Sequence, residues 1–110
     1  MDQDRIERIR KLNDMLRRQH IGGRVLITSG VQSLDRDRID QLLQEITRFD
    51  QFSSYNDPWG EHDCAVLEFE GQKYLWKIDY YDTSLNFGSP DPSDPAVTER
   101  VLTVMRSDEY

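Results

Sequence analysis

Cysteine is almost absent from this sequence: Cys64 is the only one, so no disulfide can form within the chain. Chains without disulfides are typical of reducing compartments, and we expect this protein in the cytoplasm. Long apolar runs are also missing, since none approaches the ~18 residues that a membrane span needs. The chain enters an amphipathic helix almost at once, unlike a secretory leader. We therefore expect neither a secreted disulfide scaffold nor contact with a membrane.

Basic residues are in the minority, with 14 lysines and arginines against 21 aspartates and glutamates, a net charge of −7. The imbalance is uneven: residues 1–24 hold seven basic and four acidic groups, whereas residues 25–110 hold seven basic and 17 acidic ones. An anionic body repels phosphate backbones, so we expect no direct binding of nucleic acid. A protein partner with a basic surface fits the charge better. The alternative is that the acidity only supports solubility.

The length of 110 residues suits one modest core, so we predict a single domain over residues 1–110. Apolar periodicity predicts helices over residues 4–19 and 35–49 and a short interior strand over residues 25–28. A β-hairpin is expected over residues 62–81, followed by a third helix from residue 94. The predicted fold class is α+β, in the order α-β-α-β-β-α, with helices packed on an antiparallel sheet of about three strands.

Two of these helices have recognisable starting residues. Asp35 suits the N-cap of the second helix, and the apolar residues that follow it at helical spacing are Ile39, Leu42, Leu43, Ile46 and Phe49. Asp94-Pro95 is a cap followed by proline at the first helical position, which predicts the start of the third helix. The inward face of that third helix would consist of Val97, Val101, Val104 and Met105.

The hairpin can be predicted to its register. Gly71-Gln72 fits a two-residue type II′ turn, which sets Glu70 opposite Lys73. Counting outward gives one apolar face, with the pairs Phe69–Tyr74, Leu67–Trp76 and Ala65–Ile78. The same register brings the acidic residues near position 60 and those near position 80 to one edge of the molecule.

That edge is the candidate site, although no complete catalytic signature is present and no catalytic residue is assigned. The residues predicted to bind a partner are Asn56, Asp57, Trp59, Glu61, His62, Asp63, Asp79, Tyr80, Tyr81 and Asp82. Tyrosine and tryptophan are favoured because they dominate interface hot spots, and Tyr55 belongs to the same aromatic set. Cys64 is expected to have a raised pKa beside Asp79 and Glu68, hence low reactivity.

Several motifs also resemble a bacterial family of small proteins known only as a domain of unknown function. They are Asn13-Asp14, Gly22-Gly23-Arg24-Val25, Phe49-Asp50, Asn56-Asp57-Pro58-Trp59-Gly60-Glu61-His62-Asp63, Trp76-Lys77-Ile78-Asp79-Tyr80-Tyr81-Asp82 and Phe87-Gly88-Ser89-Pro90-Asp91-Pro92. The resemblance implies a small cytoplasmic accessory protein from plasmids, prophages or other mobile elements. It implies no reaction, no cofactor and no residue roles.

Three functions stay open. The preferred interpretation is a non-enzymatic interaction protein whose acidic edge docks on a basic protein, as an inhibitor or modulator of a nucleic-acid-handling machine such as an anti-CRISPR protein. The first alternative is a metal-dependent hydrolase or nuclease, because carboxylates and imidazole suit Mg²⁺ or Mn²⁺; its ligands would be Asp57, Glu61, His62, Asp63 and Asp79. The second alternative is a structural homodimer.

Overall fold

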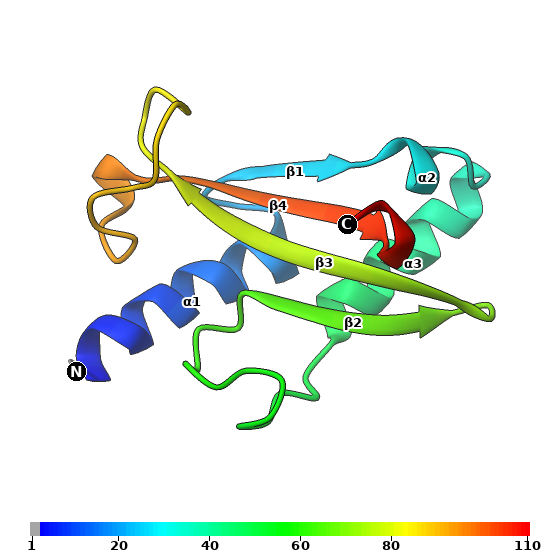
Figure 1. Ribbon diagram of the computed structural model, residues 1–110, viewed down its shortest axis with the longest axis horizontal. Helices are drawn as coiled ribbons and strands as arrows, with labels where there is room; N and C mark the ends of the chain where they lie inside the picture. The colour runs from blue at the N-terminus through cyan, green and yellow to red at the C-terminus, as the bar shows by residue number, and fades with distance from the viewer. Residues whose placement is uncertain (1–2) are drawn as a thin grey trace.

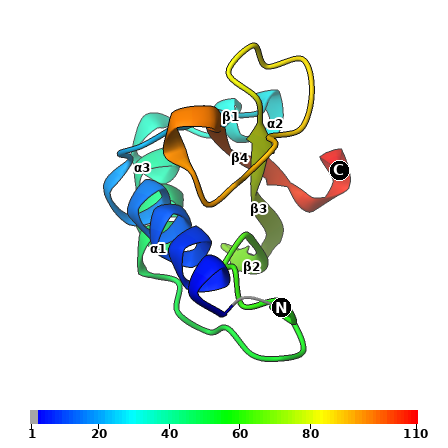
Figure 2. The same ribbon diagram turned by 90° about the vertical axis from the view of Figure 1, so that its left-hand side faces the viewer.

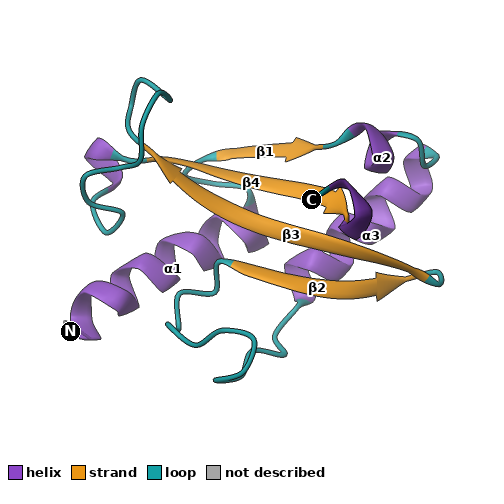
Figure 3. Cartoon of the chain, viewed as in Figure 1, coloured by secondary structure: helices purple, strands orange, loops and turns teal. Residues whose placement is uncertain are grey.

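A four-stranded sheet forms the middle of the molecule, and its two long helices lie on one face (Figures 1 and 3). This computed structural model describes residues 3–110. The helices are α1 (Gln3–Gln19), α2 (Ser29–Gln32) and α3 (Arg36–Arg48), with 3₁₀ turns η1 (Pro95–Val97) and η2 (Ser107–Glu109). The strands are β1 (Arg24–Ile27), β2 (Cys64–Phe69), β3 (Gln72–Tyr81) and β4 (Glu99–Arg106).

The sheet order is β1-β4-β3-β2, which confirms the α+β class but corrects the predicted sheet. The sheet has four strands rather than three and is mixed, because β1 runs parallel to β4 while the other pairs are antiparallel. The strand predicted as interior, β1, is an edge strand. Its short apolar run resembled that of a buried strand because Val25 and Ile27 pack against the core.

The third helix of the prediction is wrong. Asp94 caps a turn as expected, accepting a hydrogen bond from the amide of Ala96 at 2.9 Å, but η1 ends at Val97 and the chain continues as β4. β4 is a central strand covered on both faces, so Val101 is buried as well as Leu102 and Val104. Burial on both faces produces a nearly continuous apolar run that periodicity cannot tell from a helix.

The hairpin register is shifted by two residues from the prediction. Phe69 pairs with Gln72, and Leu67 pairs with Tyr74. The turn is Glu70-Gly71, whose φ angles of 52° and 80° are those of a type I′ turn rather than type II′. A shift of two keeps every side chain on the predicted face, because the side chains of a strand alternate with period two. The apolar face is therefore as predicted, although its pairs are not.

Helices α1 and α3 agree with the predicted helices, and Asp35 caps α3 by accepting a hydrogen bond from the amide of Arg38 at 2.9 Å. Figure 2 shows both helices on one side of the sheet, with the C-terminal η2 on the other. The core between them is centred on Trp76, which is fully buried. Within residues 3–110, the structure holds no helix long and apolar enough to cross a membrane.

Candidate functional site

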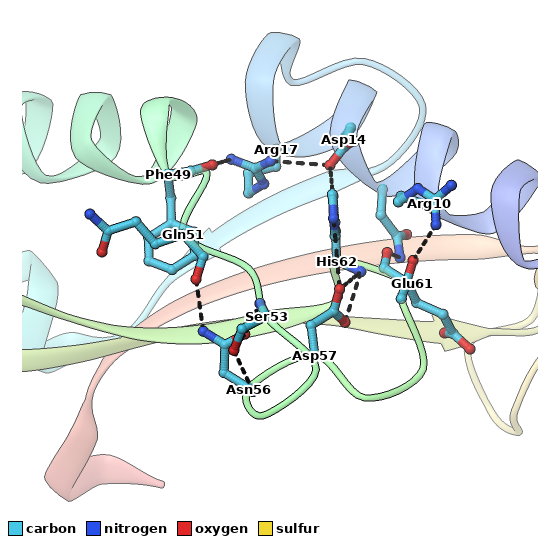
Figure 4. A network of polar contacts seen from close by, with 12 residues as sticks. Arg10, Asp14, Arg17, Phe49, Gln51, Ser53, Asn56, Asp57, Glu61 and His62 are labelled. Atoms are coloured by element: carbon cyan, nitrogen blue, oxygen red, sulfur yellow. Dashed lines mark hydrogen bonds and ion pairs between the residues drawn. The ribbon is translucent and has the colours of Figure 1, made fainter.

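The loop between α3 and β2, residues 49–63, carries most of the predicted site and is held firmly against α1 (Figure 4). Arg10 donates from Nη1 to the carbonyl of Gly60 at 2.9 Å, and Asn13 donates from Nδ2 to the carbonyl of Glu61 at 3.0 Å. At the next residue of α1, the carboxylate of Asp14 contacts the imidazole of His62 at 2.9 Å. Three successive residues of the loop are thus attached to one helix.

His62 lies between two carboxylates. Because a carboxylate only accepts, Nδ1 donates to Asp14, while Nε2 lies 3.7 Å from Asp57. The backbone amide of His62 also donates to Asp57, at 3.2 Å. The imidazole stacks on Phe52 with ring centroids 3.8 Å apart and planes 7° from parallel. The contacts of His62 therefore join the two halves of the loop to each other and to α1.

A second cluster links the loop to β3 and β4. Asn13 donates to the hydroxyl of Tyr80 at 2.7 Å and accepts from Nε of Arg100 at 2.8 Å. The Tyr80 hydroxyl in turn donates to the carboxylate of Glu61 at 2.7 Å, and burial raises the pKa of Tyr80. Arg100 also stacks over the Tyr80 ring and donates to the carbonyl of Pro92. This cluster therefore joins five separate segments of the chain.

Arg17 closes the C-terminal end of α3. Its Nη1 donates to the carbonyls of Ile46 at 2.9 Å and Phe49 at 2.8 Å, and its Nη2 donates to Asp14 at 3.1 Å. The last carbonyls of a helix lack the usual partners within the helix, and this fully buried guanidinium donates to two of them, in addition to the bond from the Phe49 amide to the Ile46 carbonyl. It also stacks over Trp76. Burial lowers the pKa of Arg17, and the pairing with Asp14 opposes that shift.

The structure brings residues near position 60 and near position 80 together, as the hairpin argument required. The bond between Tyr80 and Glu61 is one link, and Asp63 and Asp79 line the same shallow pocket, of about 290 Å³. Asp79 forms an ion pair with Lys77. Two candidates from near position 60 therefore lie beside two from near position 80.

Several candidates, however, have internal roles. Asp57 is buried, and Tyr80 is bonded within the second cluster. Asn56 closes its own loop, accepting from the amide of Ser53 at 2.8 Å and donating to the carbonyl of Gln51 at 2.9 Å. In the loop after β3, the carboxylate of Asp82 accepts a hydrogen bond from the hydroxyl of Ser84, and this bond lowers the pKa of Asp82.

Exposed aromatic side chains lie in the middle of the α3–β2 loop. Trp59 is 68% exposed and Tyr55 is 96% exposed, whereas Tyr81 is only partly accessible. Trp59 also lines a groove of about 410 Å³ against α1, together with Ile6 and Arg10. These two aromatic side chains are the candidates that the fold leaves free to bind.

Asp63 is the candidate whose ionisation the fold opposes. Burial, with the nearby charge of Glu61, raises its pKa above the ordinary 3.8. Such a carboxyl stabilises the folded state below pH 3.8, and this contribution is lost as the pH rises through the raised pKa. At neutral pH we therefore expect Asp63→Asn to raise the Tm. The gain should vanish below pH 3.8, and the exposed control Asp40→Asn should change little; an equal Tm for wild type and Asp63→Asn at pH 7 would contradict the argument.

The acidic residues do not gather as a metal centre. Within residues 3–110, no three histidine, cysteine, aspartate or glutamate side chains are grouped so that they could hold a metal ion. The five ligands named for the hydrolase are thus not assembled into a site here. Cys64 has a raised pKa as predicted, but the causes are burial and the charges of Asp63 and Asp57, not those of Asp79 or Glu68.

Sequence reasoning missed the residues that organise the network, namely Asn13, Asp14, Arg17 and Arg100. Asn13 lies on the inward stripe of α1, three residues from buried Leu16 and four from buried Ile9, and Arg17 lies four residues after Asn13. A polar residue at an apolar position of a helix was the available signal. Arg100 alternates inward with Leu102 and Val104, a pattern hidden while β4 was taken for a helix.

The chain was compared with known protein families, curated proteins and solved structures. A family described as a protein of unknown function, DUF3768, matches residues 27–109. The chain belongs to this family. The match confirms the resemblance to a domain of unknown function, and its range includes the motifs from Phe49 to Pro92. No curated protein and no solved structure matches the chain.

The motifs behind the resemblance converge on the network. Asn13 and Asp14 form one motif, His62 belongs to a second and Tyr80 to a third; Pro92 ends the last motif and accepts from Arg100. Each of these polar groups is bonded to another within the protein. The network therefore acts as a clamp that fixes the α3–β2 loop, and it leaves Tyr55 and Trp59 outside.

Proposed function

We propose that this protein is a non-enzymatic interaction protein that binds a partner through the exposed middle of the α3–β2 loop, around Tyr55 and Trp59. The observation that carries the proposal is the exposure of Trp59 (68%) and Tyr55 (96%) on a loop that is otherwise clamped to α1. Large aromatic side chains at low conformational cost dominate protein-binding hot spots. A loop that is already ordered gives up little entropy when it binds, which favours affinity.

The partner we propose has a basic surface. Residues 25–110 carry 17 acidic and seven basic groups, and complementary charge speeds association and excludes wrong partners. Proteins that handle nucleic acids have basic channels because they must bind phosphates. An inhibitor or modulator of such a machine, supplied by a mobile element in the manner of an anti-CRISPR protein, is the concrete form of the proposal.

Affinity capture at two salt concentrations tests this function. The wild-type protein, immobilised and exposed to a bacterial lysate, should retain a basic protein in about 0.1 M salt and release most of it in about 1 M salt, since the Debye length falls from ~10 Å to ~3 Å. The double variant Tyr55→Ser/Trp59→Ser should retain little of it. Phe87→Ser is the matched control, because Phe87 is 73% exposed on a different loop. Equal retention by the wild type and the double variant would refute the proposal.

A further inference from the structure

Strand β2 ends the sheet, and among residues 3–110 no strand neighbours its outer side. The amide of Ile78 donates to the carbonyl of Asp63 at 2.7 Å, which makes this a hydrogen-bonded pair of the β2–β3 ladder. Bonded and non-bonded pairs alternate along an antiparallel ladder. The backbone groups of Ala65 and Leu67 therefore face β3, whereas those of Val66 and Glu68 point away from the sheet.

This edge lacks most of the features that protect an edge strand, and Glu68 is its only charged side chain. Proteins block such edges with lysine, proline, bulges or very short strands. β2 has six residues with no lysine or proline, and its register with β3 runs without a bulge. Val66, in the middle, is 56% exposed. The opposite edge differs, because β1 has only four residues and opens with Arg24, which pairs with Glu99.

A groove of about 370 Å³ runs beside the free edge, between β2 and the last turn of α3. Its charged lining residues are Glu45, Asp50 and Glu68, with Arg48 as the one cation. The excess of acid favours a basic occupant. It disfavours a second copy of this chain, which would bring two acidic grooves and two net charges of −7 together.

We propose that a basic segment of the partner protein adds to β2 as a fifth strand. The unpaired groups of Val66 and Glu68 supply the backbone hydrogen bonds, and the groove receives the basic side chains, as in other cases of β-strand addition. The inference rests on the proposed function and adds the conformation of the partner: extended and rich in lysine or arginine. The groove begins at residues 49–51, where the α3–β2 loop starts, so one partner can contact both.

Amide hydrogen exchange with a synthetic peptide tests the inference. In the free protein, the amides of Val66 and Glu68 should exchange quickly and those of Ala65 and Leu67 slowly. Saturating amounts of a six-residue peptide that alternates lysine and valine should slow exchange at Val66 and Glu68 by about tenfold or more. A peptide alternating glutamate and valine, and a lysine–valine peptide N-methylated on its pairing side, should have no such effect.

Two variants give a matched comparison. Val66→Lys places a cation on the free edge and should abolish the protection, whereas Leu26→Lys, at a site 51% exposed on β1, should leave it intact. Unchanged exchange at Val66 and Glu68 with the lysine–valine peptide would overturn the inference, as would equal protection by the glutamate peptide. So would protection that grows with protein concentration alone, which would indicate a second copy. One further outcome is a captured partner that requires Tyr55 and Trp59 for binding and yet leaves the exchange rates of the Val66 and Glu68 amides unchanged. That result would refute the added strand and support the proposed function.

Discussion

Replacing Arg17 by methionine should reduce the free energy of unfolding by about 3–5 kcal/mol, the usual loss when one member of a buried charge pair is removed. The Arg17 side chain is 0% exposed, so solvent does not screen its interactions. Its removal takes the guanidinium donor away from the carbonyls of Ile46 and Phe49 at the buried end of α3, and only Ile46 keeps a second donor, the amide of Phe49. Because domains of this size are stable by only ~5–15 kcal/mol in total, the variant should be close to unfolding at 37 °C.

Arg18→Met is the matched control, because Arg18 is the next residue of α1 and is exposed. Its effect should stay within about 0.5 kcal/mol. Urea unfolding followed by circular dichroism measures both variants. Similar midpoints for Arg17→Met and Arg18→Met would contradict the role assigned to Arg17 as the donor that closes α3.

Replacing Asn13 by leucine should cost about 2–4 kcal/mol, because it leaves buried polar groups without partners. Three hydrogen bonds are lost: those to the carbonyl of Glu61 and the hydroxyl of Tyr80, and the one received from Arg100. The leucine side chain has the same number and branching of heavy atoms and leaves no cavity, so the loss reports hydrogen bonding. The α3–β2 loop should also loosen, with faster amide exchange at His62.

The control for this variant is Asn86→Leu, since the side chain of Asn86 is exposed and only its backbone amide is bonded. Its unfolding midpoint in urea should match that of the wild type. A loss below about 1 kcal/mol for Asn13→Leu, or unchanged exchange at His62, would show that the network is not what holds the loop.

Local chemistry in the sequence predicted the elements whose signals lie within a few residues. The N-cap at Asp35, the period of α3, the end of α1 and the apolar face of the hairpin were all correct. The predicted hairpin register was wrong because Gly71 fits both the first central position of a type II′ turn and the second central position of a type I′ turn. Only the positive φ of Glu70, a residue that rarely adopts it, decides between them.

Features that depend on distant segments were not predictable in the same way. β4 was taken for a helix because its burial on both faces is set by the sheet and by what covers it, not by its own residues. The clamp joins Asn13 to Glu61 and Tyr80, which lie 48 and 67 positions further along the chain. No local pattern in the sequence predicts such a pairing. The sequence identified the region of the candidate site. Only the structure shows which of its residues are exposed, such as Trp59, and which are buried, such as Asp57.

The most direct test of the account measures how the captured partner binds to Trp59→Ala and to Phe87→Ala by isothermal titration. Both side chains are large, aromatic and exposed, but only Trp59 lies on the clamped loop. We expect Trp59→Ala to raise the dissociation constant by about 30-fold or more, which corresponds to the ~2 kcal/mol that a hot-spot residue contributes. Phe87→Ala should leave the dissociation constant unchanged. Equal dissociation constants for the two variants would contradict the claim that this loop presents the binding surface.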